Sequence, residues 1–426
     1  MELKDRYSFK EIVEGQKKPL DFKIAAAVEV LKNAFTLPGP YSVAFSGGKD
    51  STVLWHLIRT YFPDQSYHVI FGNTGVEFPE SLKFARHLGK EWGDGEKVLF
   101  HEVLPLRLEE DELKYEAQRN ILDRLIREGR LAEVLKNDGK LKSALALERM
   151  ATSEEMEDFR ARGLIWKKGI RKSYWYCVDQ YGWPILGKSA CKLTAKRINI
   201  DCFLRFSETV SDKEKLKDFY DLLRHVKVSN HCCSILKKEP SEKKQAELGV
   251  KVVIKGLMAA ESHARMVSFS SRGHIFCSSR PHAQEFYHVS PLSFWTDDDI
   301  WEYIRLFNVP YGPLYDIEYT NHKGQVCKIK RNGCVSCATD IAFPNNHFSV
   351  LRQTHPEFWE LYMSHGMAEQ LIALQRYMGN GKKNYINIGR DADDVMERRP
   401  CAFDDIGEYI EKNEFTDSEY DSEAPI

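Results

Sequence analysis

The chain has 426 residues, of which 42% are hydrophobic and 29% charged, and its formal net charge is −2. This length and apolar content are typical of a globular protein with two or three domains. No basic start precedes an apolar signal-peptide core, and no apolar run is long enough to span a bilayer, so a cytoplasmic protein without membrane contact is expected. Ten cysteines without a secretory signal favour reduced thiols and metal chemistry over a disulfide framework.

Residues 1–38 form a polar lead with one predicted helix at 21–34. Apolar runs then predict strands at 41–45, 67–71 and 97–104, and helices with amphipathic spacing at 50–59 and 80–92. Short connections in such a β-α-β-α-β series imply a doubly wound parallel sheet. The predicted fold class is therefore α/β.

Charged helix formers dominate residues 107–230, which we predict to be a mostly helical insertion in a nucleotide-binding domain that spans 39–310. Basic and aromatic residues alternate at 166–176, and 188–197 is again basic. Interleaved cations and rings suit a nucleic-acid backbone with stacked bases, and a solvated surface loop is the other interpretation.

The sheet is predicted to resume at 250–255 and 286–289, and Thr296 with Asp297 is a good cap for the acidic helix that follows. Residues 311–402 are predicted to combine loops, a Cys-x-x-Cys motif and a helical stretch over 348–378. The acidic end, 403–426, is predicted to be a mobile tail.

A glycine turn lies between the first strand and its helix, with the sequence Ser46-Gly47-Gly48-Lys49-Asp50-Ser51. The glycines allow backbone N–H groups and the helix dipole to point at one anion, while the serines add hydroxyl donors and the lysine adds a cation. The spacing is not that of a Walker motif, and no GxGxxG dinucleotide turn occurs in the chain. An ordinary glycine turn before a helix is the competing interpretation.

Two pairs of cysteines form the second candidate site. Cys232 and Cys233 are adjacent, and Cys334 and Cys337 form a Cys-x-x-Cys motif about a hundred residues later. Four thiolates in two close pairs can hold a [4Fe-4S] cluster or a zinc ion, and adjacent cysteines fit the cluster better than a compact zinc knuckle. The alternative is that Cys232 and Cys233 are buried core thiols. Six other cysteines lack such pairing, and most are expected to be structural: Cys177, Cys191, Cys202, Cys277, Cys327 and Cys401.

Six motifs in order resemble the phosphoadenosine phosphosulfate reductase family of the PP-loop ATP pyrophosphatase superfamily, over most of residues 39–340. SGGKDS resembles the nucleotide loop, and Asn73-Thr74-Gly75 with Phe78-Pro79-Glu80 is similar to DTGxxFPE. The other matches are CCxxRKxxP-like at 232–240, GxRxxxSxxR-like at 256–265, PLxxWxxxDVWxYI-like at 291–304 and LYxxGYxxxGCxxC-like at 314–337.

Departures from the family pattern matter as well. Leu236 and Met258 replace two arginines that would meet sulfate or phosphate in a reductase, and Asn73 replaces the usual acid. The reductases carry a nucleophilic cysteine in an ECGLH-like tail, whereas this sequence ends in SEYDSEAPI and Cys401 is a poor substitute. An attack of a thiol on sulfate sulfur is therefore not expected.

The nucleotide loop, by contrast, is complete. The long helical insertion, the NTGVEFPE form of the second motif and the retained cluster cysteines most resemble the ATP pyrophosphatase subunit of bacterial DNA phosphorothioation systems of the Dnd and Ssp types. That resemblance implies cleavage of ATP to AMP and pyrophosphate to activate a DNA backbone phosphate. The implied cofactors are ATP, Mg²⁺ and a [4Fe-4S] cluster, with zinc the less favoured occupant. The implied partners are DNA, reached through partner proteins, a cysteine desulfurase and other phosphorothioation proteins, while a homodimer stays open.

The resemblance also assigns site residues. Catalytic roles fall to Ser46, Lys49 and Asp50, although Asp50 could position Mg²⁺ or only cap the helix. An adenine pocket is expected near Asn73 and Thr74, and Glu261 and Arg265 could equally form a surface ion pair. The predicted nucleotide contacts are Ser46, Gly47, Gly48, Lys49, Asp50, Ser51, Asn73, Thr74, Gly75, Lys237, Glu261, Ser262 and Arg265. The predicted cluster ligands are Cys232, Cys233, Cys334 and Cys337.

Two other functions stay open. The first is an adenylylsulfate or phosphoadenylylsulfate reductase-like enzyme that takes its thiol from another protein. The second is a cluster-bearing redox sensor whose nucleotide site no longer turns over.

Overall fold

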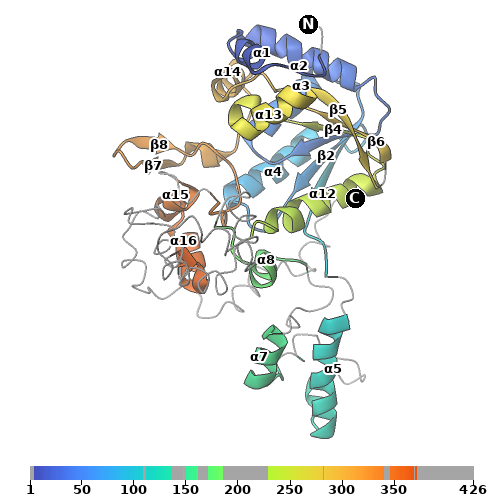
Figure 1. The fold of residues 1–426 in the computed structure, drawn as a ribbon, viewed down its shortest axis with the longest axis vertical. Coiled ribbons are helices and arrows are strands. Elements are labelled where there is room, and N and C mark those ends of the chain that lie inside the picture. Colours follow the sequence, from blue (N-terminus) through green and yellow to red (C-terminus); the bar gives the residue numbers. More distant parts are fainter. Residues whose placement is uncertain are drawn as a thin grey trace, which may run out of the picture.

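The computed structural model describes residues 4–108, 112–135, 147, 149–161, 171–185, 229–281, 283–339, 346–368 and 370–371. A six-stranded sheet lies at its centre, with strand order β3-β2-β1-β4-β6-β5 (Figure 1). The strands are β1 (Tyr41–Phe45), β2 (Tyr67–Gly72), β3 (Val98–Val103), β4 (Val252–Lys255), β5 (Ile275–Arg280) and β6 (Ala283–Val289).

The sheet confirms the predicted α/β class, with one correction. Strands β3, β2, β1, β4 and β6 run parallel, but β5 pairs antiparallel with β6 at the edge, so the sheet is not wholly parallel. The prediction missed β5 because its second half, Ser278-Ser279-Arg280, is polar and lacks the β-branched residues that mark a strand.

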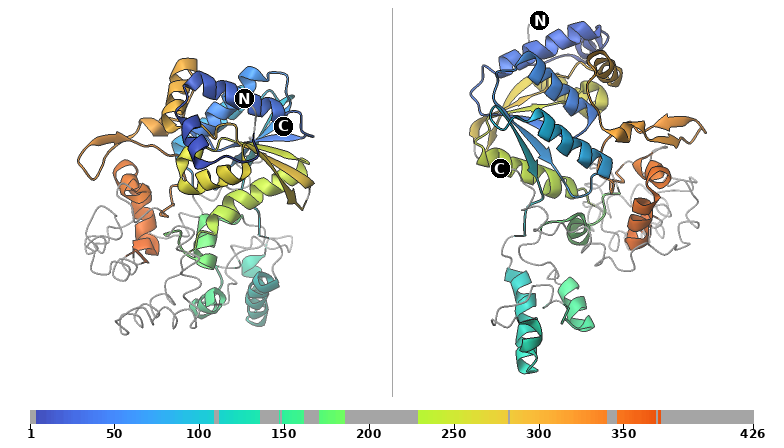
Figure 2. Two further views of the ribbon diagram at one scale, coloured as in Figure 1. Left: turned by 45° about the horizontal axis from the view of Figure 1, so that its top comes forward. Right: turned by 180° about the vertical axis from the view of Figure 1, so that it is seen from behind.

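Helices cover both faces of the sheet (Figure 2). Buried side chains of α2 (Leu20–Ala34), α3 (Lys49–Tyr61), α4 (Pro79–Trp92) and α14 (Asp297–Phe307) share one core with the sheet. On the other face, α12 (Glu239–Glu247) packs against β2 and β3. Beyond the strand ends, α13 (His263–Arg272) contacts α1 (Phe9–Gln16), a helix of the lead that the sequence analysis did not predict.

The described part of the insertion contains α5 (Glu112–Arg127), η1 (Leu131–Val134) and α7 (Ser153–Ala161). These elements share a small core of their own, built on Ile121, Leu125 and Phe159. In Figures 1 and 2, α5 and α7 project away from the sheet.

The nucleic-acid interpretation of 166–176 is wrong for its described aromatic residues. Tyr174, Trp175 and Tyr176, at the start of α8 (Tyr174–Tyr181), are 3%, 8% and 8% exposed and belong to a second core with Trp183. Buried rings are unavailable to nucleic-acid bases. Residues 166–170 and 188–197 lie outside the described residues.

The second core also holds the C-terminal helices α15 (His347–Thr354) and α16 (Pro356–Tyr362), which π-helical η5 (Met363–Met367) follows. The predicted loop after Pro310 contains a 3₁₀ turn, η4 (Pro313–Asp316), and a hairpin of β7 (Glu318–Thr320) and β8 (Val326–Lys328). The rest of the predicted 348–378 helix, Cys401 and the 403–426 tail lie outside the described residues. No helix in the described ranges has both the length and the apolarity that crossing a membrane requires.

Candidate functional site

The predicted phosphate loop joins β1 to α3 at the carboxyl edge of the sheet. Gly47 has a φ of 69°, which glycine adopts without strain, and Gly48 is the N-cap of α3. Ser51 Oγ accepts the Ser46 N–H at 3.2 Å and lies 3.1 Å from Ser46 Oγ. The loop therefore gathers two hydroxyls beside the first-turn N–H groups of a helix, which have no intrahelical acceptor.

Lys49 is buried between two carboxylates. Its Nζ lies 2.9 Å from Asp50 Oδ1 and 2.7 Å from Asp297 Oδ1. Burial opposes the charge of Lys49, but the two carboxylates together raise its pKa. Burial also raises the pKa of Asp50, against the attraction of Lys49, and Glu261 and Asp297 add to this rise. The loop is thus lined by a cation and several acids.

These contacts settle whether Asp50 is a helix cap and add Asp297 to the candidate site. Asp50 does not cap α3, since Gly48 is the N-cap and no side chain bonds there, so the cap interpretation of Asp50 is wrong. Asp297 was predicted only as part of a capped helix start, yet it reaches Lys49 from α14. The acidic run at 297–299 was the available signal, but it did not show which helix would face the loop.

Tyr315 and Asn332 complete the wall of the loop, and the sequence analysis named neither as a site residue. Tyr315 is buried, and its Oη accepts the Lys49 N–H at 3.1 Å. Asn332 Nδ2 donates to the Ser46 carbonyl at 3.2 Å, and Asn332 Oδ1 accepts a hydrogen bond from Ser81 Oγ at 2.9 Å. The segment that leads to the Cys-x-x-Cys motif therefore lies directly against the phosphate loop.

The turn after β2 contains the predicted adenine contacts Asn73 and Thr74, both buried. Asn73 Nδ2 donates to Glu102 Oε1 at 2.7 Å, and Asn73 Oδ1 accepts the Gly75 N–H at 2.9 Å. Thr74 Oγ1 donates to Glu77 Oε2 at 2.7 Å. These side chains hold the shape of the turn, and the adenine pocket beside them stays a prediction.

The segment after β4 lies against the start of α3. A Cβ on Gly256 would be 2.9 Å from the Asp50 carbonyl oxygen. Glu261 ends the 3₁₀ turn η3 (Ala259–Glu261), and Ser262 caps α13 by accepting the Arg265 N–H at 3.3 Å. Glu261 and Arg265 are therefore not on one helix, although Glu261 Oε2 and Arg265 Nε lie 3.9 Å apart as a partly exposed ion pair. Their role as substrate contacts stays a prediction.

The two cysteine pairs lie in one neighbourhood. Cys334 forms a β-bridge with Glu77, and the Val335 N–H donates to the Val76 carbonyl at 2.7 Å, so the Cys-x-x-Cys motif lies beside the turn after β2. Cys232 precedes the π-helix η2 (Cys233–Lys238) and interacts electrostatically with Cys334.

The thiols lie near one another, but their positions do not form a metal site. Within the described ranges, no three histidine, cysteine or carboxylate side chains converge closely enough to hold one metal ion. The donor chemistry, two pairs of thiols, fits a thiolate-bound group, and the cluster stays a prediction. We therefore derive no reaction step through a cluster.

The thiols differ in their acidity. A hydrogen bond from Cys232, with Lys237 and Lys238 nearby, lowers the pKa of Cys233 to about 6, whereas burial raises that of Cys334 to about 12. Because Cys233 is exposed, the interpretation of both adjacent cysteines as buried core thiols is wrong for Cys233.

A fifth thiol and a predicted lysine lie near these pairs. Cys177 is buried and interacts with Cys232 and Cys233, a proximity that its isolated position in the sequence did not indicate. Lys237, predicted as a substrate contact, is exposed and lies near Glu77 and Cys334. It therefore sits between the β2 turn and the thiols.

Residues 40–145 and 190–339, more than half of the chain, match the protein family described as phosphoadenosine phosphosulfate reductase domain. The chain belongs to that family. This reductase-family chain is 26% identical to the adenosine 5′-phosphosulfate reductase of Staphylococcus epidermidis over 180 residues, which cover 37% of the chain and 66% of that relative. It is 34% identical to adenosine 5′-phosphosulfate reductase 2 of Bacillus subtilis over 100 residues, 24% of the chain and 39% of the relative. These matches span less than two thirds of either relative.

Two solved structures are also similar to the reductase-family chain. One is a phosphoadenylyl-sulfate reductase from Candida auris in a phosphate complex, at 15% identity and a TM-score of 0.33, covering 68% of this chain and 83% of that one. The other is the FMN adenylyltransferase of Candida glabrata, solved with FMN and an ATP analog, at 12% identity and a TM-score of 0.32, covering 80% and 74%.

Proposed function

We propose that this reductase-family chain is an ATP pyrophosphatase that activates a DNA backbone phosphate for sulfur incorporation. The observation that carries the proposal is Lys49, held between Asp50 and Asp297 where a glycine turn opens α3. Carboxylates at a phosphate loop repel a bare sulfate or phosphate. They suit a polyphosphate that brings Mg²⁺, which binds one or two carboxylates together with phosphate oxygens.

In the proposed reaction, an oxygen of the DNA phosphate forms a bond to the α-phosphorus of ATP. The bond from that phosphorus to the α–β bridging oxygen breaks, and its electron pair leaves with pyrophosphate. The first-turn N–H groups of α3 and the Lys49 ammonium stabilise the charge that develops on the leaving group. Asp50 and Asp297 would hold Mg²⁺, which would neutralise further phosphate charge. The outer sulfur of a persulfide on a cysteine desulfurase partner would then form a bond to the DNA phosphorus as AMP leaves, and a thiol reductant would cleave the remaining sulfur–sulfur bond.

The proposal includes an iron–sulfur cluster on Cys232, Cys233, Cys334 and Cys337. The support is the donor set, two close cysteine pairs on segments that meet beside the β2 turn. Zinc is the less favoured occupant.

The test of the ATP chemistry measures AMP and pyrophosphate released from Mg²⁺-ATP. Lys49→Ala and Ser46→Ala should each reduce release by roughly a hundredfold or more, because each removes a group that stabilises the leaving pyrophosphate. Lys90→Ala changes an exposed lysine at the end of α4 and should leave the rate unchanged. Release of ADP and phosphate instead would contradict the proposal.

A sulfonucleotide-reducing enzyme is the second candidate, and the activity named for the two reductase relatives supports it. Incubation with adenylylsulfate and thioredoxin, followed by measurement of sulfite, separates the two candidates. Sulfite formation without pyrophosphate release from ATP would favour the second.

A further inference from the structure

Lys255 carries a charge that no carboxylate of the described chain pairs with at salt-bridge distance. It ends β4 and lies in register with Ala44 of β1, two residues before the phosphate loop. The hydrogen bond of its Nζ goes to His288 Nδ1 on β6, at 3.4 Å. A partly buried ammonium is thus held mainly by an imidazole.

The imidazole of His288 lies between Lys255 and Ser278. Burial, with Lys255, Arg280 and Arg272 nearby, lowers the pKa of His288 to about 4. Its ring stacks on Phe276, with centroids 4.5 Å apart, and its Nε2 lies 2.9 Å from Ser278 Oγ. With Nε2 donating to Ser278, Nδ1 is left to accept from Lys255. The arrangement holds Lys255 in place without neutralising it.

The surroundings of Lys255 are strongly cationic. Burial, followed by the charges of Arg280 and Arg265, lowers the pKa of Lys255 to about 8, and Lys238 adds to the effect. Glu242 opposes this effect, and its Oε1 pairs with Arg280 Nη1 at 2.7 Å, while Glu261 Oε2 lies 3.9 Å from Arg265 Nε. A desolvated cation among cations is unfavourable until an anion binds.

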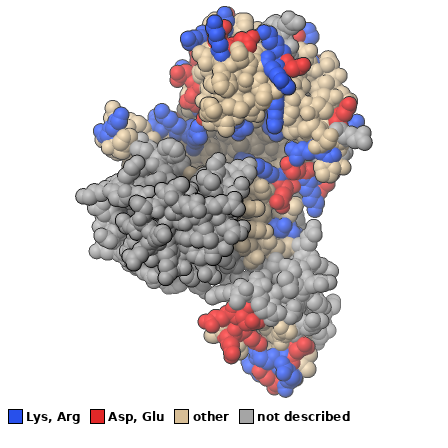
Figure 3. All heavy atoms as spheres, in the orientation of Figure 1, with Lys and Arg blue, Asp and Glu red and all other residues tan. Residues whose placement is uncertain are grey.

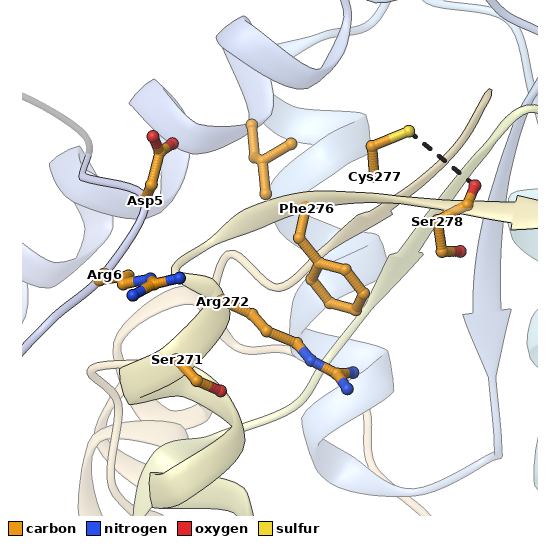
Figure 4. Close-up of a pocket in the computed structure, with 8 residues that line it drawn as sticks. Asp5, Arg6, Ser271, Arg272, Phe276, Cys277 and Ser278 are labelled. Atoms are coloured by element: carbon orange, nitrogen blue, oxygen red, sulfur yellow. Dashed lines mark hydrogen bonds between the residues drawn. The ribbon is translucent and has the colours of Figure 1, made fainter.

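Charged residues also lie at the edge of the sheet. Ser278 lines a cavity of about 520 Å³ along β5, and Figure 4 shows Asp5 and Arg6 of the N-terminal segment and Arg272 of α13 around it.

Lys255 also offers a cation close to a position where the family pattern has an arginine and this chain does not. Leu236 and Met258, which replace two family arginines, are 2% and 4% exposed, so both positions are apolar and buried. Lys255 lies three residues before Met258 and supplies a cation from the strand instead of from the loop. Gly256, the next residue, packs against the Asp50 carbonyl, so the end of β4 lies beside the start of α3.

We propose that Lys255, together with Arg265 and Arg280, forms a second oxyanion site that receives the tetrahedral phosphate or sulfate group of the second substrate. The inference rests on the proposed function, because it places ATP in the adjacent phosphate loop. The pyrophosphate leaving group would then lie at the carboxyl end of β1, and the phosphate or sulfate of the second substrate would lie at the carboxyl end of the neighbouring strand β4.

The site is tested by equilibrium dialysis of the full chain against radiolabelled sulfate, without ATP and at constant ionic strength. Lys49→Ala is the starting protein, so that sulfate in the phosphate loop does not contribute. Adding Lys255→Met should weaken sulfate binding roughly tenfold or more, the effect of losing a hydrogen bond to a charged group. Adding Lys251→Met, at the exposed position just before the same strand, should change sulfate binding by less than about twofold. Equal binding in both double variants would overturn the proposal.

Sulfate binding measured over a pH series is a second test, and it does not require the Lys255→Met variant to fold. Sulfate binding should fall as the pH rises above about 8, because Lys255 then loses its proton. Lys255→Arg keeps its charge and should bind sulfate without this decline. If sulfate binding still declines above pH 8 in Lys255→Arg, the decline comes from another group, and the role of Lys255 is overturned.

Competition separates the two sources of the oxyanion. Displacement of sulfate by a short DNA duplex would assign the site to a DNA phosphate, and displacement by adenylylsulfate would assign it to a sulfonucleotide. Displacement by neither would overturn its assignment to the second substrate. If sulfate binding fails while Lys49-dependent pyrophosphate release persists, the second site alone is wrong; the reverse result contradicts the proposed function alone.

Discussion

Tyr315 shows how single residues define the phosphate loop. Its Oη accepts the Lys49 N–H, and Lys49 Nζ lies 5.7 Å from the centre of its ring. Tyr315→Phe would leave that N–H without a partner, and we expect the free energy of unfolding to fall by about 1–2 kcal/mol. A phosphate oxygen of ATP would supply a new acceptor, so Mg²⁺-ATP should raise the midpoint of thermal unfolding more in the variant than in wild type, as calorimetry can measure.

The matched control is Tyr311→Phe, which removes a long, exposed contact of 3.4 Å from the hydroxyl to Asp316. Tyr311→Phe should change neither the free energy of unfolding nor the ATP-induced shift of the unfolding midpoint. A smaller ATP-induced shift in Tyr315→Phe than in wild type would show that the hydroxyl itself binds the nucleotide.

Burial of His274 is expected to make folding stability depend on pH. The residue is 2% exposed, and burial lowers its pKa from 6.5 to about 4. The unfolded chain therefore binds a proton before the folded chain does, so stability should fall as the pH drops from 6.5 to about 4. The loss attributable to this residue is about 3 kcal/mol.

Denaturant unfolding over that pH range tests the assignment. His274→Phe should reduce the loss, since phenylalanine does not titrate, although its unfolding free energy at neutral pH should also be lower because the hydrogen bond to the Ser290 carbonyl is removed. His87→Gln, at an exposed position on α4, should leave the pH dependence unchanged. Parallel curves for His274→Phe and wild type would exclude His274 as the source.

The loop itself could be predicted at the residue scale because six consecutive residues carry its chemistry. The residues that contact the loop from distant parts of the chain could not be predicted in this way. Tyr315 lies 266 residues from the N–H that it accepts, and Asp297 reaches Lys49 only because α14 returns to the sheet beside α3. Lys255 gave no signal either, since its environment depends on β5, β6 and α12 packing around it.

At the element scale, β1 to β3 were predicted well because apolar strands alternate with amphipathic helices. The lead helix α1 was missed because it has only 8 residues, although the Ser8–Glu11 capping box was an available signal. The aromatic stretch 174–176 was misinterpreted because composition alone does not distinguish a ring that packs in a core from a ring that stacks on a base.

The β7–β8 hairpin is the element best suited to contact DNA in the proposed function. Lys and Arg side chains gather over it in Figure 3, and Lys323, Lys330 and Arg331 are exposed on the hairpin and the segment after it. Lys328 is instead paired with Asp316 at 2.9 Å. A double change, Lys323→Ala with Lys330→Ala, should weaken duplex binding and reduce the slope of log affinity against log salt by about two.

Fluorescence anisotropy over a salt series measures both quantities. Lys32→Ala with Lys90→Ala removes the same charge from the sheet domain, on α2 and α4, and should leave the slope unchanged. An unchanged slope in the hairpin variant would remove the hairpin from the DNA-binding surface.

At the scale of the whole molecule, the chain builds a sheet core and a second core, and the candidate site lies where segments of both meet. The turn after β2 comes from the sheet, while Cys334 and Val335 pair with it from the C-terminal part of the chain. The sequence predicted the order of these regions, but their meeting point depends on packing of Phe78 in the second core. Composition had no bearing on it, since a net charge of −2 says nothing about where charges lie.

A cluster bound at this meeting point would join the two cores. Protein purified anaerobically should then contain about four iron and four sulfide per chain, and Cys232→Ser should lose most of both. Cys277→Ser, an exposed thiol on β5, should retain them. Because the thiolates come from segments about a hundred residues apart, removal of iron by a chelator should also lower the midpoint of thermal unfolding of the wild type, but not that of Cys232→Ser. A wild type fully loaded with zinc would contradict the cluster, whereas iron that leaves without any change in unfolding would show that the metal does not connect the cores.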